Sequence, residues 1–243
     1  MVLHTVVIAL ITTNLNSFLT NANIMINDIP DIDLSLKPIL QFPDIWQNLT
    51  YIAGFFKIIL ALVVINSVNN EFVYGTARQN IIDGYSHKEW LFSKIGLAKT
   101  LALFSTMLVV ILGLVLGYTQ GVKVELFDVF LRLDFLLAYF IELIVYFIYA
   151  LFLSIVLKRT SISIILLLVY DFILEPILSW SLPKRLSDFL PMSTIDNLNT
   201  FPFSKYIGNE AIEAVSIEQL IWAIAYGIAF GLFSYLILKN RDL

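Results

Sequence analysis

Four ionisable side chains interrupt the long apolar runs of this sequence: Lys57, Glu142, Asp171 and Glu175. Ionisable residues inside a membrane are costly, so they usually pair with one another or line the path of a substrate or ion. Lys57 and Glu142 each lie about eight residues, or about 12 Å, below the outer end of their runs, and Asp171 lies about 10 Å below its own. We therefore expect Lys57 to pair with Glu142 or Asp171, either as a structural ion-pair cluster or as the polar lining of a transport path. Glu175, directly before Pro176, is expected to mark the outer end of a helix.

The apolar runs that carry these side chains dominate the composition. Hydrophobic residues make up 59% of the 243 residues and charged residues 14%, with a mean hydropathy of +0.85. Soluble domains have roughly 45–50% apolar and about 25% charged residues. Runs long enough for the roughly 20 helical residues that cross a bilayer lie at about 2–20, 49–67, 97–118, 135–157, 160–178 and 219–238. The sequence therefore predicts an all-α polytopic membrane protein with six transmembrane helices in a single domain, 1–243.

The first run, 2–20, could be a retained span or a cleaved secretory signal. Signals of that kind normally begin with basic residues, and this run contains neither Lys nor Arg. We therefore expect it to be retained.

Several classes of chemistry are disfavoured. The chain has no cysteine, which excludes disulfides and thiolate sites. Neither a G-x-x-x-x-G-K-[ST] phosphate loop nor an H-E-x-x-H zinc motif occurs,, nor does a G-x-S-x-G nucleophile elbow. The net charge is −4 without a basic patch, which argues against nucleic acid as a partner. We therefore expect no catalytic residue, no metal site and no cofactor in this chain.

Orientation follows from the distribution of Lys and Arg, which favour cytoplasmic loops. With Met1 inside, eight of them fall in the inner segments 68–99, 158–159 and 239–243. Six are spread over the longer outer segments, 21–48, 119–134 and 179–218. This bias predicts that both termini lie in the cytoplasm. We expect a multi-pass protein of the cell inner (plasma) membrane.

A polar stretch, NEFVYGTARQNIIDGYSHKEWLFSK at residues 70–94, joins the second and third runs. Glu71 should mark the exit into water, and Gly75 followed by Thr76 is a breaker and then a helix N-cap. A short helix is expected over about 76–83, ended by Gly84 in a left-handed conformation. Ser86 and the glutamate three residues later have capping-box spacing, so a second helix should start there. The stretch thus predicts a compact corner between two spans.

The short helix carries an apolar stripe of Ala77, Ile81 and Tyr85 at helical spacing, with Arg78 beside it,. Two interpretations are open. The corner could be a well-capped interfacial loop whose aromatic residues lie at the headgroup level, or it could transmit force to another protein.

This stretch resembles the segment between the second and third spans of ABC type 2 export permeases. Those permeases show an acidic residue, Gly-Thr, a basic residue, Gly, Ser and a terminal Ser-Lys. The matching positions are Glu71, Gly75, Thr76, Arg78, Gly84, Ser86, Ser93 and Lys94. The resemblance implies a coupling helix that docks on a cytoplasmic ATPase subunit, with the stripe of Ala77, Ile81 and Tyr85 in the contact and Arg78 as a polar anchor. It further implies a dimer with a second permease copy, ATP and Mg²⁺ bound by the partner, and export of a substrate.

One departure from the family is that no basic amphipathic helix precedes the first run, so part of the ATPase-facing surface is expected to be missing, or the start to be truncated. The segment 179–218 fits either the re-entrant helices of that family or a plain surface loop. Two other functions stay open: a secondary transporter or channel-like carrier without an ATPase, and a non-transporting membrane scaffold. The first of these should show an inverted repeat, and no convincing one is visible.

Overall fold

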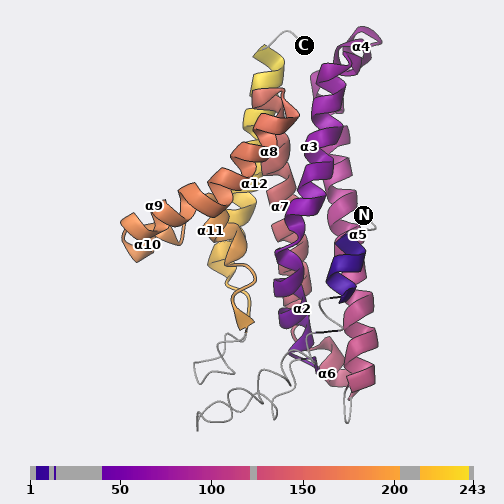
Figure 1. Ribbon diagram of the computed structural model, residues 1–243, viewed down its shortest axis with the longest axis vertical. Coiled ribbons are helices and arrows are strands. Elements are labelled where there is room, and N and C mark those ends of the chain that lie inside the picture. Colours follow the sequence, from indigo (N-terminus) through magenta and orange to yellow (C-terminus); the bar gives the residue numbers. More distant parts are fainter. Residues whose placement is uncertain (1–3, 11–13, 15–39, 121–124, 203–213, 241–243) are drawn as a thin grey trace. The chain divides into compact units, whose positions relative to one another are not determined.

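The computed structural model describes residues 4–10, 14, 40–120, 125–202 and 214–240 (Figure 1). Over these residues the chain is helical and contains no strand, which confirms the all-α prediction. Besides a helical turn at 4–10, the elements are α2 (Ile45–Gly54), α3 (Lys57–Val73), α4 (Thr76–Ile82), α5 (His87–Gln120), α6 (Leu126–Phe130), α7 (Asp134–Leu157), α8 (Thr160–Val169), the π-helix η1 (Tyr170–Leu174), α9 (Glu175–Ser181), α10 (Lys184–Ser187), α11 (Pro191–Asp196) and α12 (Ile217–Asn240).

Several of these helices are long and apolar enough to cross a membrane, as an integral membrane protein requires. Within the described ranges there are four: His87–Thr119, Leu126–Leu157, Thr160–Ser181 and Ile217–Asn240. The pair α2 and α3 would be a fifth if counted as one interrupted span. These segments cover the runs predicted from 49 onward, whereas most of the run at 2–20 lies outside the described residues. Six spans therefore stay a prediction.

The described residues fall into two compact units. The first unit lies within Met1–Phe56, Phe104–Phe140 and Leu198–Ser216, and the second within Lys57–Leu103, Ile141–Asn197 and Ile217–Leu243. Helices α5 and α7 contribute to both.

The first unit is organised around Trp46 of α2, which is buried. Its indole Nε1 donates a hydrogen bond to the backbone carbonyl of Val129 in α6 at 2.9 Å. Close by in the sequence, Arg132 forms an ion pair with Asp44, Nη1 to Oδ1, at 2.6 Å. The indole ring packs so closely on α5 that a Cβ added at Gly113 would lie 2.5 Å from it. A glycine is therefore needed at that point of the helix.

This close approach makes Gly113→Ala a test of the packing of the first unit. We expect the free energy of unfolding to fall by about 1–3 kcal/mol, the usual cost of overpacking, because the hydrogen-bonded Trp46 must shift. Gly96→Ala is the matched control, because Gly96 lies in the same helix with open space around its Cα. That change should be neutral or stabilise by up to about 1 kcal/mol through helix propensity. Equal melting temperatures for the two variants would contradict the packing described.

In the second unit α3 packs against α8 and α4, and α11 packs against α12. Gly227 of α12 lies against Val145 of α7, whose Cγ2 would be 3.2 Å from an added Cβ. After η1, helices α9 and α10 lead away from α12, and α11 returns to it (Figure 1). The hydroxyl of Tyr226 in α12 fixes this return by donating to the backbone carbonyl of Phe189 at 2.6 Å. The described part of the predicted outer segment 179–218 thus contains short helices rather than a plain loop.

Candidate functional site

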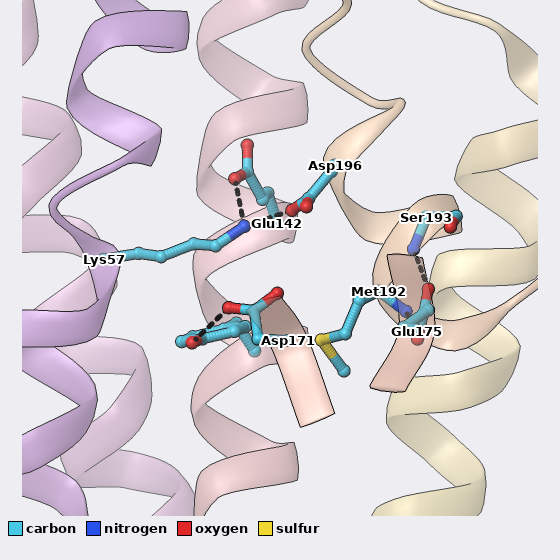
Figure 2. A network of polar contacts seen from close by, with 8 residues as sticks. Lys57, Glu142, Asp171, Glu175, Met192, Ser193 and Asp196 are labelled. Atoms are coloured by element: carbon cyan, nitrogen blue, oxygen red, sulfur yellow. Dashed lines mark hydrogen bonds and ion pairs between the residues drawn. The ribbon is translucent and has the colours of Figure 1, made fainter. Parts of the chain in front are cut away.

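A buried ion pair joins α3 to α7 in the second unit. Lys57 is the first residue of α3, and its Nζ lies 3.0 Å from Oε1 of Glu142 in α7. The same ammonium group forms an ion pair with Asp196, at the end of α11 (Figure 2). The lysine and glutamate side chains are 7% and 3% exposed, whereas that of Asp196 is 51% exposed. The Lys57–Glu142 pairing expected from their equal depth is present, and Asp196 is an addition that depth did not predict.

Tyr146 connects this ion pair to Asp171. The Nζ of Lys57 lies 4.8 Å from the centre of the Tyr146 ring, a cation–π distance,. The phenol hydroxyl of Tyr146 donates to Oδ2 of Asp171 at 2.9 Å. Asp171 therefore belongs to the cluster through Tyr146, and the polar cluster consists of Lys57, Glu142, Tyr146, Asp171 and Asp196.

Asp171 lies in the π-helix η1, where the backbone hydrogen bonds join residues five apart instead of four apart as in α8,. Segments of this kind are uncommon and occur frequently at functional sites. The extra residue changes which side chains share a face of the helix. The π-helix ends directly before Glu175, the first residue of α9.

Glu175 has a different position from the one expected. It is 2% exposed, and its carboxylate accepts hydrogen bonds from the backbone N–H groups of Met192, at 2.9 Å, and Ser193 (Figure 2). These donors belong to the first turn of α11, where N–H groups have no partner within the helix. The prediction that Glu175 marks a helix end is wrong, because Pro176 occupies the first turn of α9, a position that needs no N–H donor,.

The polar cluster thus ties α3, α7, η1 and α11 together, with Glu175 as a second attachment for α11. The polar cluster contains three carboxylates and one lysine, and an excess of carboxylates can indicate a cation site. Among the described residues, however, no group of three or more His, Cys, Asp or Glu is placed to hold a metal ion. The arrangement can pair charge and position the α9–α11 segment. Asp196 is its most accessible member.

A second candidate site is the corner between α3 and α5, residues 74–86. Gly75 and Gly84 flank α4 with φ values of +72° and +104°, so glycine is required at both ends,. The expected left-handed conformation of Gly84 is confirmed. The prediction that Thr76 caps the helix is wrong: Gly75 is the N-cap, and Thr76 is the first residue of α4, with its hydroxyl donating to the carbonyl of Glu71 at 3.4 Å.

The predicted capping box at the start of α5 is confirmed. The backbone N–H of Ser86 donates to Oε2 of Glu89 at 2.8 Å, and the N–H of Glu89 donates to Oγ of Ser86 at 3.2 Å. Because these side chains satisfy donors at the helix start, α5 begins sharply at His87 and continues without a break into its apolar part.

Glu71 lies in the last turn of α3, which ends at Val73. Its carboxylate forms an ion pair with Lys94 of α5 and accepts a hydrogen bond from Trp90 Nε1 at 2.7 Å. Trp90 and Lys94 are one helical turn apart and both are buried. The glutamate, tryptophan and lysine, which we call the Glu71 bridge, join the helices on either side of the corner. Trp90 was not predicted to be a partner of Glu71, although Trp90 and Lys94 are four residues apart and therefore lie on one face of α5.

The exposed residues of the corner differ from the predicted stripe. Ala77 is buried within the chain and Ile81 is half-buried, so Ala77 cannot contact another protein. Tyr85 is 57% exposed, and Arg78 is exposed as well. The other exposed apolar side chains of the corner are Tyr74 and Ile82, which periodicity did not select, and Val73, the last residue of α3, is exposed as well.

A profile of the family described as "Protein of unknown function (DUF2705)" matches residues 3–243. No curated protein matches the chain.

Proposed function

The chain belongs to the DUF2705 family, and since that description assigns no activity, we propose a function from the residues themselves: the membrane subunit of an ATP-driven exporter of the ABC type 2 class. In this proposal two permease copies form the substrate path in the plasma membrane, with both termini in the cytoplasm. ATP and Mg²⁺ are bound by separate ATPase subunits, and α4 is the helix that contacts them.

The observation that carries the proposal is the Glu71 bridge. Glu71 and Lys94 stand near the two ends of the motif that resembles the permease segment, and they form an ion pair with each other. The hydrogen bond from Trp90 and the 5.5 Å contact between the Phe72 and Trp90 rings add to it. A displacement of α4 therefore moves α3 and α5 together, as coupling to an ATPase would require.

The exposed face of the corner suits contact with a protein groove. Tyr74, Ile82 and Tyr85 are 77%, 68% and 57% exposed, and Arg78 supplies a positive charge. Short helices commonly bind by placing apolar side chains in a groove while charged residues at the rim select the partner. We propose that these residues, rather than Ala77, contact the ATPase.

Two substitutions in the corner test this proposal. Arg78→Glu should weaken copurification of the ATPase subunit about tenfold or more, because reversed charge at a complementary rim costs more than about 1.4 kcal/mol. Gly84→Val should reduce transport-coupled ATP hydrolysis further, because a β-branched residue is strained at a φ of +104°,. Arg185→Glu, the same charge reversal at an exposed position of α10, is the control and should behave as wild type. Wild-type binding and hydrolysis in both corner variants would show that the corner is an interfacial loop.

A second candidate, an ion-coupled carrier without an ATPase, is favoured by the polar cluster beside η1. Buried ionisable residues and π-helical turns both occur along ion pathways and at functional sites. The two candidates differ in one measurement. Substrate movement that continues in vesicles with the purified chain and an ion gradient, without any ATPase, would favour the carrier. A chain that moves nothing under either condition but still binds a membrane partner would be a scaffold.

A further inference from the structure

An apolar groove of about 730 Å³ lies between α5, α7 and α12, within the second unit. Isoleucine, leucine and valine side chains from all three helices line it, including Ile95, Ile144 and Ile228. Its volume falls in the range of about 300–1,000 Å³ that is typical of ligand sites. None of the residues discussed for the proposed function lines it.

The polar groups of the groove gather at one end. Among its lining residues Lys88 and Tyr235 carry polar side chains, and none is acidic. The ammonium group of Lys88 lies over the Tyr235 ring, 5.5 Å from its centre. Lys239, exposed on α12, is one helical turn beyond Tyr235 and so continues the same helix face,. A positively charged end therefore adjoins an apolar interior.

The length of the groove matches one half of a bilayer. Its lining on α12 extends from Ile224 to Tyr235, which is about 16 Å at 1.5 Å per residue. The hydrocarbon core of a bilayer is about 30 Å thick, so one leaflet contributes about 15 Å. An acyl chain that enters beside Lys88 and Tyr235 would reach the end of the groove near the bilayer centre.

We propose that this groove binds one acyl chain of an anionic phospholipid, with the headgroup phosphate at Lys88 and Lys239. Burial of the chain's methylene groups stabilises the complex, and the lysines select the negative headgroup. The site is independent of any ATPase and of the corner.

A second copy of the chain fits this groove less well. Copies inserted in the same orientation and related by a two-fold axis along the membrane normal meet at equal depth. Each would bring its own Lys88 and Lys239 to the level of the other's, and like charges would face each other. An anionic lipid instead complements the charge.

The test uses the full-length chain in detergent micelles doped with either phosphatidylglycerol or phosphatidylcholine, with bound lipid counted by native mass spectrometry. Wild type should retain phosphatidylglycerol more tightly than phosphatidylcholine. Lys88→Gln and Lys239→Gln should each lower phosphatidylglycerol affinity about fivefold and lower phosphatidylcholine affinity less, because the choline cation already offsets the charge of its phosphate. Equal retention of the two lipids by wild type would overturn headgroup selection.

A filling substitution tests the groove itself. An added Cβ at Gly231 meets nothing within 4 Å, so Gly231→Phe should enter the groove without a clash. Displacing even two methylene groups should lower the affinity for either lipid about tenfold. Gly96→Phe, also in open space on α5, is the control for bulk and folding and should bind as wild type. Unchanged lipid retention in Gly231→Phe would reject the site. Dissociation of a dimer in that variant, measured by light scattering with no change in lipid count, would instead assign the groove to a second copy.

Discussion

Lys57→Met should destabilise the protein by about 3–5 kcal/mol, the range found in soluble proteins when one member of a buried ion pair is removed. Glu142 is 3% exposed, and it would stay in the interior without this cation. The Tyr146 ring would also lose its contact with the ammonium group. The measurement is thermal unfolding of the detergent-solubilised protein.

Matched variants separate the loss of charge pairing from the loss of side-chain packing. Lys57→Met combined with Glu142→Gln should recover part of the stability, because the second substitution removes the isolated charge. Asp196→Asn should cost no more than about 1 kcal/mol, since that carboxylate is 51% exposed,. Failure of Glu142→Gln to restore any stability to Lys57→Met would show that the ion pair is not what holds α3 to α7.

Glu175→Ala should be the next most damaging change, with an expected loss of about 3 kcal/mol. Its carboxylate accepts from the N–H groups of Met192 and Ser193, and a hydrogen bond to a charged group contributes about 1.5–3 kcal/mol. Removal leaves the first turn of α11 without these acceptors. The consequence should be a lower melting temperature and faster proteolysis between α9 and α11, because α11 is freed from α9.

Glu175→Gln is the informative companion, since it keeps the shape and one acceptor oxygen but not the charge. Its effect should fall between those of wild type and Glu175→Ala. Glu218→Ala, at an exposed position in the first turn of α12, is the control and should leave both measurements unchanged. Wild-type stability in both Glu175 variants would mean that α11 is held in place by its apolar contacts with α12.

The helices of this chain and part of the polar cluster could be predicted because both follow from rise and length. Apolar runs of about 20 residues form helices in a membrane. Because a helix rises about 1.5 Å per residue, the number of residues between a side chain and the outer end of its run gives its depth. Lys57 and Glu142 have the same depth, and their pairing was predicted for that reason. Asp196 could not be found in this way. It lies after the fifth run, where the path of the chain follows from short turns and contacts with α12 rather than from periodicity.

Other misses arose from local geometry that residue type does not encode. The sequence YDFIL has no feature that predicts the π-helix at Tyr170–Leu174. The extra residue in the hydrogen-bonded turn of this π-helix changes the face of the helix on which Glu175 lies. The cap of α4 was assigned to Thr76 because threonine is a common N-cap, whereas the left-handed Gly75 takes that position. The contact residues of α4 were predicted from helical periodicity alone. In so short a helix, periodicity does not distinguish the buried face from the exposed face.

Lys57 is synthesised well before both carboxylates with which it forms ion pairs. Glu142 follows Lys57 by 85 positions and Asp196 by 139. At about 5–20 residues per second, the lysine leaves the ribosome about 4–28 s before these carboxylates. During that interval the cation at the start of α3 has neither of its carboxylate partners. A lysine at the centre of a membrane helix costs about 2.5–3.5 kcal/mol, and the leucine, isoleucine and valine residues of α3 offset such a cost. A chain that ends before residue 142 contains neither carboxylate partner of Lys57, so the contacts that join α3 to α7 and α11 can form only late in synthesis, after those two helices have been made.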